Sequence, residues 1–357
     1  MVSTLPPRQE IRFVESRDGT RIATAMSGSG PTIVRAAHWL THVSHDPVSP
    51  VWRHWVEEFS SQNRLLRYDL RGCGLSDRDV SDISFDAWLA DLEAVTEGLT
   101  EPFTLVGMSQ GGALSIAYAL KYPERVERLV LIGAYAKGAR ARAKSDQELL
   151  EAETLTNLMR LGWGGGLNAF NKVFTNLFIP DGTSEQQSWW QTLEQQTACV
   201  ETAVKTFEVL QQIDVSGMLE KVVVPTLILH ARHDARVPFV EGQRLASLIQ
   251  DAQFVPLESA NHVLLEIEPA WAAFKDALRA FLPLASTAET KTIDVRLTSA
   301  ESAVLNLVAK GLGNREIASA LSKSEKTVRN QVSILFEKLD VHTRAELIVR
   351  VLSGPQG

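Results

Sequence analysis

The chain has few cysteines and no long apolar run. Cys73 and Cys199 are the only two cysteines in 357 residues, and neither lies in a CxxC or Cys/His spacing, so we expect reduced thiols and neither a disulfide framework nor a structural zinc site. No apolar run reaches the ~20 residues of a membrane span, and the first residues, MVSTLPPRQE, lack the apolar core of a signal peptide. No phosphate-binding loop or metal-ligand cluster occurs. The sequence therefore predicts a cytoplasmic protein without a membrane contact, a metal or a cofactor.

The chain as a whole also lacks the positive charge that is typical of proteins that bind nucleic acid. Its formal net charge is −7. Residues 291–357, however, carry ten Lys and Arg against seven Asp and Glu, so this segment is positive by three charges while the rest is negative by ten. A mildly basic segment joined to an acidic body favours a small DNA-binding module attached to a domain of another kind.

Short β-branched segments alternate with helical patterns through the first 280 residues or so. Asp18-Gly19 is a hairpin turn signal near the start. The expected strands are Ile11–Glu15, Arg21–Met26, Thr32–Ala36, Arg64–Tyr68, Phe103–Met108, Val126–Ile132, Val224–His230 and Phe254–Leu257. The expected helices include Ser84–Leu99, Gln110–Lys121, Val240–Ile249 and Ala270–Phe281. This order predicts an α/β fold with a mostly parallel sheet and helices on both faces.

One stretch, residues 138–219, interrupts the alternation because it contains no convincing strand. We expect it to form a helical lid over the carboxyl ends of the strands. Its aromatic side chains either line a ligand cavity or form the core of the lid, and helical spacing leaves both readings open. These aromatics are Trp163, Phe170, Phe174, Phe178, Trp189 and Trp190. The predicted domains are thus 1–284, with this insertion, and 295–357, joined by an Ala/Ser/Thr/Glu-rich linker at 285–294.

A serine stands at the junction of a buried strand and a helix. The strand Phe103–Met108 runs directly into Gly107-Met108-Ser109-Gln110-Gly111 and then into a helix. A G-x-S-x-G at such a turn places the serine at a strained corner, and the glycines remove Cβ atoms that would clash with the neighbouring strand and helix. Ser109 is therefore the candidate nucleophile, and Gln110 can offer its backbone N–H to an oxyanion.

An acid and a histidine follow in the order that this chemistry requires. Asp234 comes just after the strand Val224–His230, and His262 comes just after Phe254–Leu257. Taken alone, Asp234 is explained as a helix N-cap or a turn-forming residue, and His262 as a surface histidine. Together with Ser109 they predict a Ser-His-Asp triad at one edge of the sheet.

Residues 10–284 resemble the α/β-hydrolase superfamily. Besides the three predicted triad residues, the segment Asp69-Leu70-Arg71-Gly72-Cys73-Gly74-Leu75-Ser76 is similar to that family's D-x-R-G-x-G-x-S turn after the fourth strand. The resemblance implies Ser109 as nucleophile, His262 as general base and Asp234 as the acid that orients the histidine.

The loop after the third expected strand departs from the family pattern. Family members commonly have His-Gly there, and a backbone N–H of that loop completes the oxyanion hole. Here the histidine is His38, but Trp39 takes the place of the glycine. The Trp39 N–H can still point inward, whereas its indole is expected to narrow the pocket. Loss of one oxyanion donor costs on the order of 10²–10³ in turnover, so this departure favours slow turnover or ligand capture.

Residues 297–351 predict four short helices. Leu297-Thr298-Ser299-Ala300-Glu301 has the pattern of an N-cap with an acidic residue three positions later. A tight turn separates Arg315–Leu321 from the longer Glu325–Leu339, and a last helix covers Thr343–Val351. The outward polar face of Glu325–Leu339 suits base edges and phosphates, although a merely solvated face remains an alternative. The candidate DNA-binding residues are Lys323, Lys326, Thr327, Arg329, Asn330, Gln331, Ile334 and Lys338.

The same residues resemble the LuxR-type helix-turn-helix over its full length. The matching motifs are L-T-x-x-E, G-L-x-N-x-E-I-A, S-x-K-T-V-x-N and L-F-x-K-L. The resemblance implies Glu325–Leu339 as the recognition helix in double-stranded DNA. It also implies a homodimer that forms through Thr343–Val351.

Three functions are consistent with the sequence. The first is a transcription regulator whose hydrolase-like domain binds a small ester, lactone or similar carbonyl compound and so controls DNA binding. The second is a working serine esterase or lactonase with an accessory DNA-binding domain. The third is an interaction module in which the triad is a relic.

Overall fold

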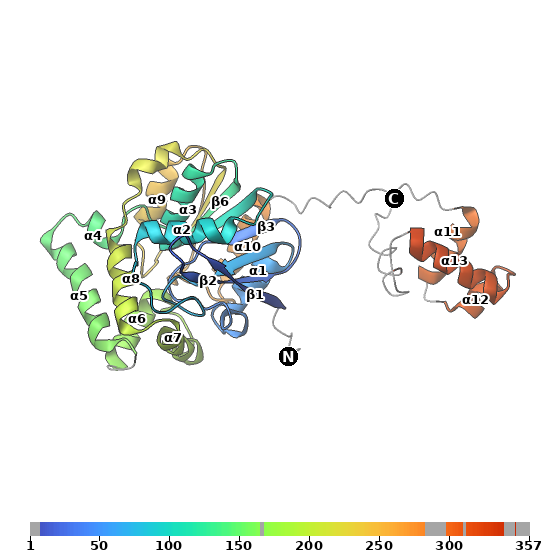
Figure 1. Ribbon diagram of the computed structural model, residues 1–357, viewed down its shortest axis with the longest axis horizontal. Coiled ribbons are helices and arrows are strands. Elements are labelled where there is room, and N and C mark those ends of the chain that lie inside the picture. The colour runs from blue at the N-terminus through green and yellow to red at the C-terminus, as the bar shows by residue number, and fades with distance from the viewer. Residues whose placement is uncertain (1–7, 165–167, 283–297, 310–311, 339–346, 348–357) are drawn as a thin grey trace. The chain divides into compact units, whose positions relative to one another are not determined.

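The computed structural model describes residues 8–164, 168–282, 298–309, 312–338 and 347. The chain divides into two compact units, Met1–Ser286 and Thr287–Gly357 (Figure 1). The predicted linker at 285–294 lies outside the described residues.

The larger unit is built on one eight-stranded sheet. Its order is β1-β2-β4-β3-β5-β6-β7-β8, in which β1 pairs with β2 and β2 with β4 antiparallel while all other neighbours are parallel. The prediction of a mostly parallel sheet with an antiparallel start is thus confirmed. The strands are β1 (Gln9–Glu15), β2 (Arg21–Ser27), β3 (Thr32–Arg35), β4 (Arg64–Tyr68), β5 (Phe103–Met108), β6 (Val126–Ile132), β7 (Thr226–Ala231) and β8 (Gln253–Leu257).

Helices cover the sheet on both faces (Figure 1). They are α1 (Arg53–Ser60), α2 (Phe85–Thr96), α3 (Gln110–Lys121), α9 (Phe239–Leu248) and α10 (Pro269–Phe281), with a short 3₁₀ turn, η1 (Asp46–Val48), before α1. Helices α1 and α10 pack together through Trp55, Trp271 and Phe274, whose ring centroids lie within 5 Å of one another. Helices α2 and α3 are joined by a 2.8 Å hydrogen bond between the hydroxyls of Thr96 and Tyr118.

The D-x-R-G-x-G-x-S turn after β4 fixes the loops at one end of the sheet. The carboxylate of Asp69 accepts hydrogen bonds from the backbone N–H groups of Val43 and Leu75, both at 2.8 Å. Gly74, at φ +56°, must lack a Cβ because that atom would lie 2.2 Å from Asp69 Oδ2. The buried guanidinium of Arg71 binds the carboxylate of Asp91 at 2.7 and 2.8 Å. This motif therefore has a structural role, and it holds the loop that follows β3 in place.

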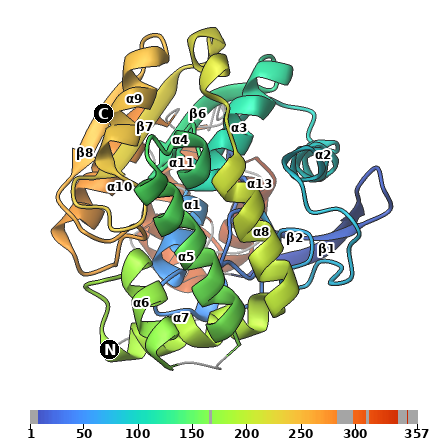
Figure 2. The same cartoon turned by 90° about the vertical axis from the view of Figure 1, so that its left-hand side faces the viewer.

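The insertion between β6 and β7 forms a layer of helices on one side of the sheet, and Figure 2 shows this layer in front of the strands. Among the described residues of 138–219 no strand occurs; the nearest is an isolated β-bridge between Lys137 and Asp214. The helices are α4 (Ala139–Arg142), α5 (Asp146–Gly162), α6 (Asn168–Phe178), α7 (Ser184–Thr197) and α8 (Val200–Gln212), followed by the 3₁₀ segment η2 (Ser216–Lys221).

The smaller unit consists of α11 (Ser299–Ala309), α12 (Asn314–Ala320) and α13 (Glu325–Lys338) in its described part. The expected capping box is present, since Thr298 Oγ1 accepts from the Glu301 N–H and Glu301 Oε2 from the Thr298 N–H. The apolar faces meet in one cluster of Val304, Val308, Ile317, Ala318, Val328, Val332, Leu335 and Leu347. Apart from Leu347, the predicted fourth helix Thr343–Val351 lies outside the described residues. Within the described part of the chain, no helix is long and apolar enough to cross a membrane.

Candidate active site and DNA-binding helix

Ser109 occupies a strained corner between β5 and α3. Its backbone has φ +53° and ψ −126°, values that a residue with a side chain adopts only where its surroundings force it. The Ser109 N–H donates to Ile132 O at 3.0 Å, which ties the corner to β6. A Cβ on Gly107 would lie 2.5 Å from Gly111 O. The expected steric reason for glycine in the G-x-S-x-G motif is therefore visible at this position.

Asp234 and His262 form a hydrogen-bonded pair after β7 and β8. His262 Nδ1 lies 2.8 Å from Asp234 Oδ2, and both side chains are almost fully buried. The other oxygen, Oδ1, accepts from the backbone N–H groups of Arg236 and Val237, both at 2.8 Å. Burial by itself raises the pKa of Asp234, but the imidazole of His262 and the N–H of Val237 outweigh burial and lower it. Asp234 is thus an ionised carboxylate that can orient the imidazole.

Gly133, which directly follows β6 and has φ +52°, makes room for this pair. A Cβ there would lie 3.0 Å from His262 Cε1 and 3.1 Å from its Nδ1. No sequence motif singled out this glycine. The only indication in the sequence is that this glycine directly follows a segment expected to be a buried parallel strand.

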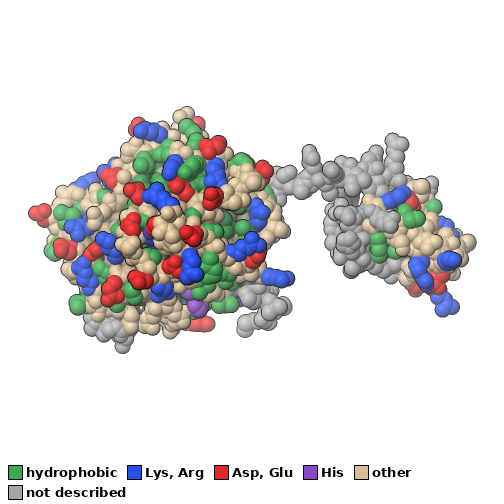
Figure 3. Space-filling view, viewed as in Figure 1, with side chains coloured by type: hydrophobic (Ala, Val, Ile, Leu, Met, Phe, Trp, Pro, Cys, Tyr) green, Lys and Arg blue, Asp and Glu red, His purple; other side chains and the backbone are tan. Residues whose placement is uncertain are grey.

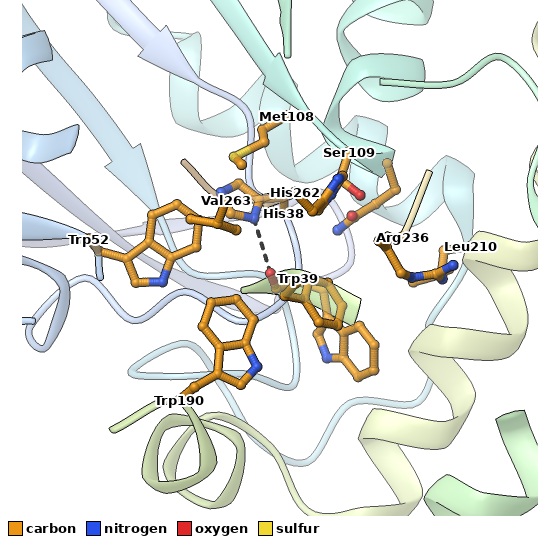
Figure 4. Close-up of a pocket in the computed structure, with 12 residues that line it drawn as sticks. His38, Trp39, Trp52, Met108, Ser109, Trp190, Leu210, Arg236, His262 and Val263 are labelled. Carbon is orange, nitrogen blue, oxygen red and sulfur yellow. Dashed lines mark hydrogen bonds between the residues drawn. The ribbon is translucent and has the colours of Figure 1, made fainter. Parts of the chain in front are cut away.

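Ser109 and His262 line one pocket together with Trp39, Gln110 and Trp52 (Figure 4). These residues follow the carboxyl ends of different strands, which lie at the same edge of a parallel sheet. Ser109 and His262 are not hydrogen-bonded to each other, and His262 Nε2 is buried without a partner among the described residues. The free volume is about 10 Å³, which is close to the least that one water molecule needs. The pocket is therefore closed in this structure.

His38 and Trp39 form the wall after β3. His38 Nδ1 lies 3.0 Å from the carbonyl oxygen of Trp39, which can only accept, so Nδ1 carries the proton (Figure 4). Burial lowers the pKa of His38 well below its usual value, so the imidazole is neutral. The backbone N–H of Trp39 has no acceptor among the described residues. Gln110 provides the first N–H of α3, a position without an intrahelical acceptor.

The indole of Trp39, one of the lining residues, is held by aromatic contacts. It stacks on Trp163 of the lid with ring centroids 5.3 Å apart and an interplanar angle of 9°. It also meets Phe174 edge-on at 5.5 Å. Loop and lid are therefore packed into one aromatic cluster above the serine.

Some of the lid aromatics line the pocket, and others form the core of the lid. Phe178 and Trp190 line the Ser109 pocket, and the ring of Phe178 meets that of His262 edge-on at 5.8 Å. Phe170 and Phe174 stack on each other at 5.2 Å inside the lid. Trp163 is likewise lid core, and Trp189 is only partly buried against it.

The sequence interpretation overlooked Arg236, Met108, Trp52 and Val263, all of which line the pocket. Arg236 is two residues after Asp234 and adds a charged group to a lining of polar, aromatic and apolar residues. Its position in the loop after β7 was the available signal.

The outward face of α13 carries the predicted DNA-binding residues. Lys326, Asn330 and Ile334 follow one another at four-residue intervals and are all exposed, Ile334 by 40%. Thr327 is also exposed, and its hydroxyl lies 2.8 Å from that of Ser324, which caps the helix. Figure 3 shows several Lys and Arg side chains on the surface of this smaller unit.

The remaining candidates on or beside α13 are engaged within the unit. Lys338 Nζ binds both carboxylate oxygens of Glu301 at 2.8 Å, an ion pair that ties α13 to α11. Lys323 donates to the half-buried Gln331 at 3.0 Å. Arg329 pairs with Glu325 at 3.3 Å on the exposed surface. The geometry thus favours a structural role for Lys338, whereas Lys326 and Asn330 are presented to solvent.

Comparisons with known proteins match both units. The alpha/beta hydrolase fold family matches residues 40–269, and the luxR family of bacterial regulatory proteins matches residues 295–351. A pyrrolizixenacetamide deacetylase from Xenorhabdus hominickii is 26% identical over 254 residues, which cover 69% of this chain and 90% of that protein. A pimeloyl-[acyl-carrier protein] methyl ester esterase from Nitrosomonas europaea is 29% identical over 243 residues, or 66% of this chain and 90% of that protein.

Solved structures show the same fold for the larger unit. An esterase from Exiguobacterium antarcticum has a TM-score of 0.65 at 22% identity and covers 75% of this chain and 98% of its own. The enol-lactonase from Burkholderia xenovorans LB400 has a TM-score of 0.60 at 20% identity, with 76% of this chain and 99% of its own covered. The two resemblances seen in the sequence are confirmed, and the chain belongs to the alpha/beta hydrolase fold family and carries a LuxR-type DNA-binding region in residues 295–351.

Proposed function

We propose that this protein is a cytoplasmic transcription regulator whose hydrolase unit binds a small ester or lactone and thereby controls DNA binding. The observation that carries the proposal is the combination in one chain of a closed serine pocket and an exposed LuxR-type helix. Ser109 and His262, which is paired with Asp234, line a pocket whose free volume is only about 10 Å³. A ligand that enters it must change the surrounding lid contacts, and such a change is what a sensor needs.

Ser109, His262 and Asp234 supply the chemistry for slow turnover. Ser109 Oγ bonds to the ester carbonyl carbon and passes its proton to His262 Nε2, while Asp234 stabilises the imidazolium that results. The ester C–O bond then breaks, and the leaving alcohol takes the proton from Nε2. A water molecule repeats the sequence on the acyl-serine and releases the acid. The free N–H of Trp39 and the first N–H of α3 are the candidate donors to the oxyanion.

The closed pocket and the indole of Trp39 favour ligand capture over fast turnover. The lid must open before an ester can reach Ser109, and the energy of opening reduces the apparent affinity of the ligand. Trp39 contacts both the lid residue Trp163 and the pocket. A ligand that displaces this indole also alters the packing of the lid.

The exposed side chains of α13 support major-groove recognition. Lys326 suits a guanine or a phosphate, Asn330 suits an adenine edge, and Ile334 offers an apolar contact to a thymine methyl group. The resemblance to LuxR-type domains implies dimers on two-fold related DNA sites. We therefore propose that this protein binds DNA as a homodimer.

Fluorescence anisotropy of duplexes from the protein's own promoter region tests this function. At low salt, full-length protein is expected to bind one of these duplexes, and a compound from a panel of small esters and lactones is expected to change the affinity. The Ser109→Ala protein should respond in the same way, because sensing requires binding and not turnover. Ser247→Ala, an exposed serine on α9, serves as the matched control. Absence of affinity for any promoter duplex, with and without the panel, would refute the regulator assignment.

An active esterase or lactonase with an accessory DNA-binding unit is the second candidate. The observation in its favour is the 2.8 Å contact between His262 and Asp234 beside a serine in the strained conformation. Labelling of Ser109 by a fluorophosphonate, together with rapid hydrolysis of p-nitrophenyl esters by the wild type, would support it. Failure of the intact protein to react with the fluorophosphonate would instead favour a pure interaction module.

A further inference from the structure

Arg236 places a positive charge in the wall of the Ser109 pocket (Figure 4). Its side chain is half-buried, and the guanidinium carbon lies 5.2 Å from the ring centroid of Phe207. Within the described residues the guanidinium has no hydrogen-bond acceptor and no ion-pair partner; only the Arg236 backbone N–H is engaged, with Asp234. The five N–H donors of the guanidinium are thus available to a ligand. Their planar, forked arrangement matches the two oxygen atoms of a carboxylate.

The same unit pairs its deeply buried arginines. Arg35 and Arg67 share the carboxylate of Asp46 at 3.0 and 2.9 Å, and Arg71 binds Asp91 at 2.7 Å. These pairs offset the cost of removing a charge from water. Arg236, by contrast, has an aromatic face beside it and no ion pair within the described residues, so its guanidinium is available to an anion.

Other pocket groups are also donors without acceptors. The indole N–H groups of Trp39 and Trp52 and the amide nitrogen of Gln110 are buried and have no acceptor in the described part of the chain. An indole N–H can only donate. The carboxylate of Asp234, which holds the lining residue His262, is already occupied by that imidazole and by two backbone N–H groups. These donors suit a ligand with oxygen acceptors, while the unpartnered Nε2 atoms of His38 and His262, which line the same pocket, are acceptors.

A second, larger cleft reaches the same arginine. Arg236 also lines a surface cleft of about 810 Å³ between the lid and α9. The cleft carries five basic side chains, Lys137, Arg142, Lys144, Arg236 and Arg244, against the three acidic ones Glu148, Glu151 and Glu241. Arg236 is thus common to an outer cleft with an excess of positive charge and to the closed pocket at Ser109.

From this placement we infer that the ligand bears a carboxylate in addition to its ester or lactone carbonyl, and that Arg236 binds this carboxylate while the carbonyl faces Ser109. The inference rests on the proposed function because it names the class of ligand for that site. The ligand class is a half-ester of a dicarboxylic acid or a lactone that carries an acid group. Arg236 is then a specificity-determining residue.

Matched pairs of esters test the assignment. The probes are the monomethyl and dimethyl esters of succinic, glutaric, adipic and pimelic acids, which differ within a pair by one negative charge. Binding is measured by thermal shift on full-length Ser109→Ala protein, and kcat/KM on protein with Ser109 intact. Arg236→Gln removes the charge, Arg236→Lys keeps it without the fork, and Arg232→Gln is the control in the same loop, since the exposed Arg232 pairs with Glu258 and lies outside the Ser109 pocket.

We expect at least one half-ester to be preferred over its diester by about 10- to 100-fold, as a charge-assisted hydrogen bond allows. Arg236→Gln should reduce that ratio to near one, Arg236→Lys should give an intermediate ratio, and Arg232→Gln should keep the full ratio. Equal binding of the two members of every pair, no binding of any half-ester, or a ratio that survives Arg236→Gln would each overturn the inference. DNA is absent from these assays. Failure of the carboxylate assignment is therefore distinct from failure of DNA control, which the anisotropy experiment reports.

Discussion

Replacement of Trp39 by alanine is expected to destabilise the hydrolase unit and to open the serine pocket. Trp39 is 6% exposed, and a buried aromatic side chain removes about 150–250 Å² from water. At about 25 cal/mol per Å² this area corresponds to roughly 4–6 kcal/mol, and measured Trp→Ala changes in cores cost about 3–5 kcal/mol. We therefore expect a loss of about 4 kcal/mol in the free energy of unfolding, which leaves a domain of ordinary stability folded.

The distribution of tryptophans provides the assay. All eight lie between residues 39 and 271, so intrinsic fluorescence in the full-length chain reports the unfolding of the larger unit alone. A loss of about 4 kcal/mol corresponds to a decrease in Tm of roughly 8–16 °C for a unit of this size. Free indole should bind the new cavity and restore part of the Tm, because a ligand that binds only the folded state stabilises it. Longer or bulkier acyl esters should also bind or react better relative to acetates, because the pocket is wider.

Trp271→Ala is the matched control. Trp271 is equally buried at 4% exposure and stacks on Phe274 with centroids 4.9 Å apart, but it lies on α10 and outside the serine pocket. It should lower Tm by a similar amount without any change in the preference among acyl chains. A Trp39→Ala protein that loses less than about 1 kcal/mol would refute the packing argument. A Trp271→Ala protein with the same altered preference would refute the assignment of Trp39 to the pocket wall.

Two further predictions concern the DNA-binding helix and the lid. Lys326→Ala should weaken duplex binding for all sequences and reduce the slope of log K against log salt by about one. Lys338→Ala should leave this slope unchanged, because Glu301 holds the Lys338 Nζ at 2.8 Å. Equal slopes for the two variants would contradict the assignment of Lys326 to DNA contact and of Lys338 to a structural ion pair. In the lid, burial raises the pKa of Glu194 well above its ordinary value of 4.5, so the folded state keeps a proton that the unfolded chain releases. As pH rises above about 4.5, the wild type should therefore lose stability relative to Glu194→Gln, and a fluorescence Tm difference that stays constant from pH 5 to 8 would exclude this explanation.

The strand pattern was predictable because burial on both faces of a parallel sheet demands continuous β-branched and aliphatic residues. Strand β5 and helix α3 have the bounds that the sequence predicts. The expected strand Val224–His230 instead begins at Thr226 and ends at Ala231. Pro225 explains the later start, because proline has no N–H to donate to a strand ladder. Such a shift moves an end of the strand but not the residues that follow it, so Asp234 still falls in the loop.

The choice between lid core and pocket wall was beyond the sequence pattern. Phe170, Phe174 and Phe178 recur every four residues on one face of α6, yet only Phe178 reaches the serine pocket. A helix crosses the pocket at one point, and its periodicity carries no information about where that point lies. The same holds for Lys338, whose partner Glu301 is 37 residues away. Whether a side chain lines the pocket, packs in the lid or forms an ion pair depends on contacts between different elements. The pattern of a single sequence predicts the elements but not these contacts.

Under the proposed function, the small volume of the serine pocket determines how far the pocket must rearrange when a ligand binds and alters DNA affinity. A space of about 10 Å³ does not hold an ester, so any ligand binds an arrangement of Trp39 and the lid that differs from the closed one. Ligand binding then shifts the population toward that open arrangement by as much as its affinity for the two arrangements differs. A tenfold change in DNA affinity requires a coupling of only about 1.4 kcal/mol between the two sites. The rearrangement of one buried indole involves about 4 kcal/mol of packing, which is more than that coupling. If Trp39→Ala relieves the closed state, the variant should hold its DNA affinity near the ligand-bound value in the absence of ligand, and anisotropy with and without the ester panel measures this directly.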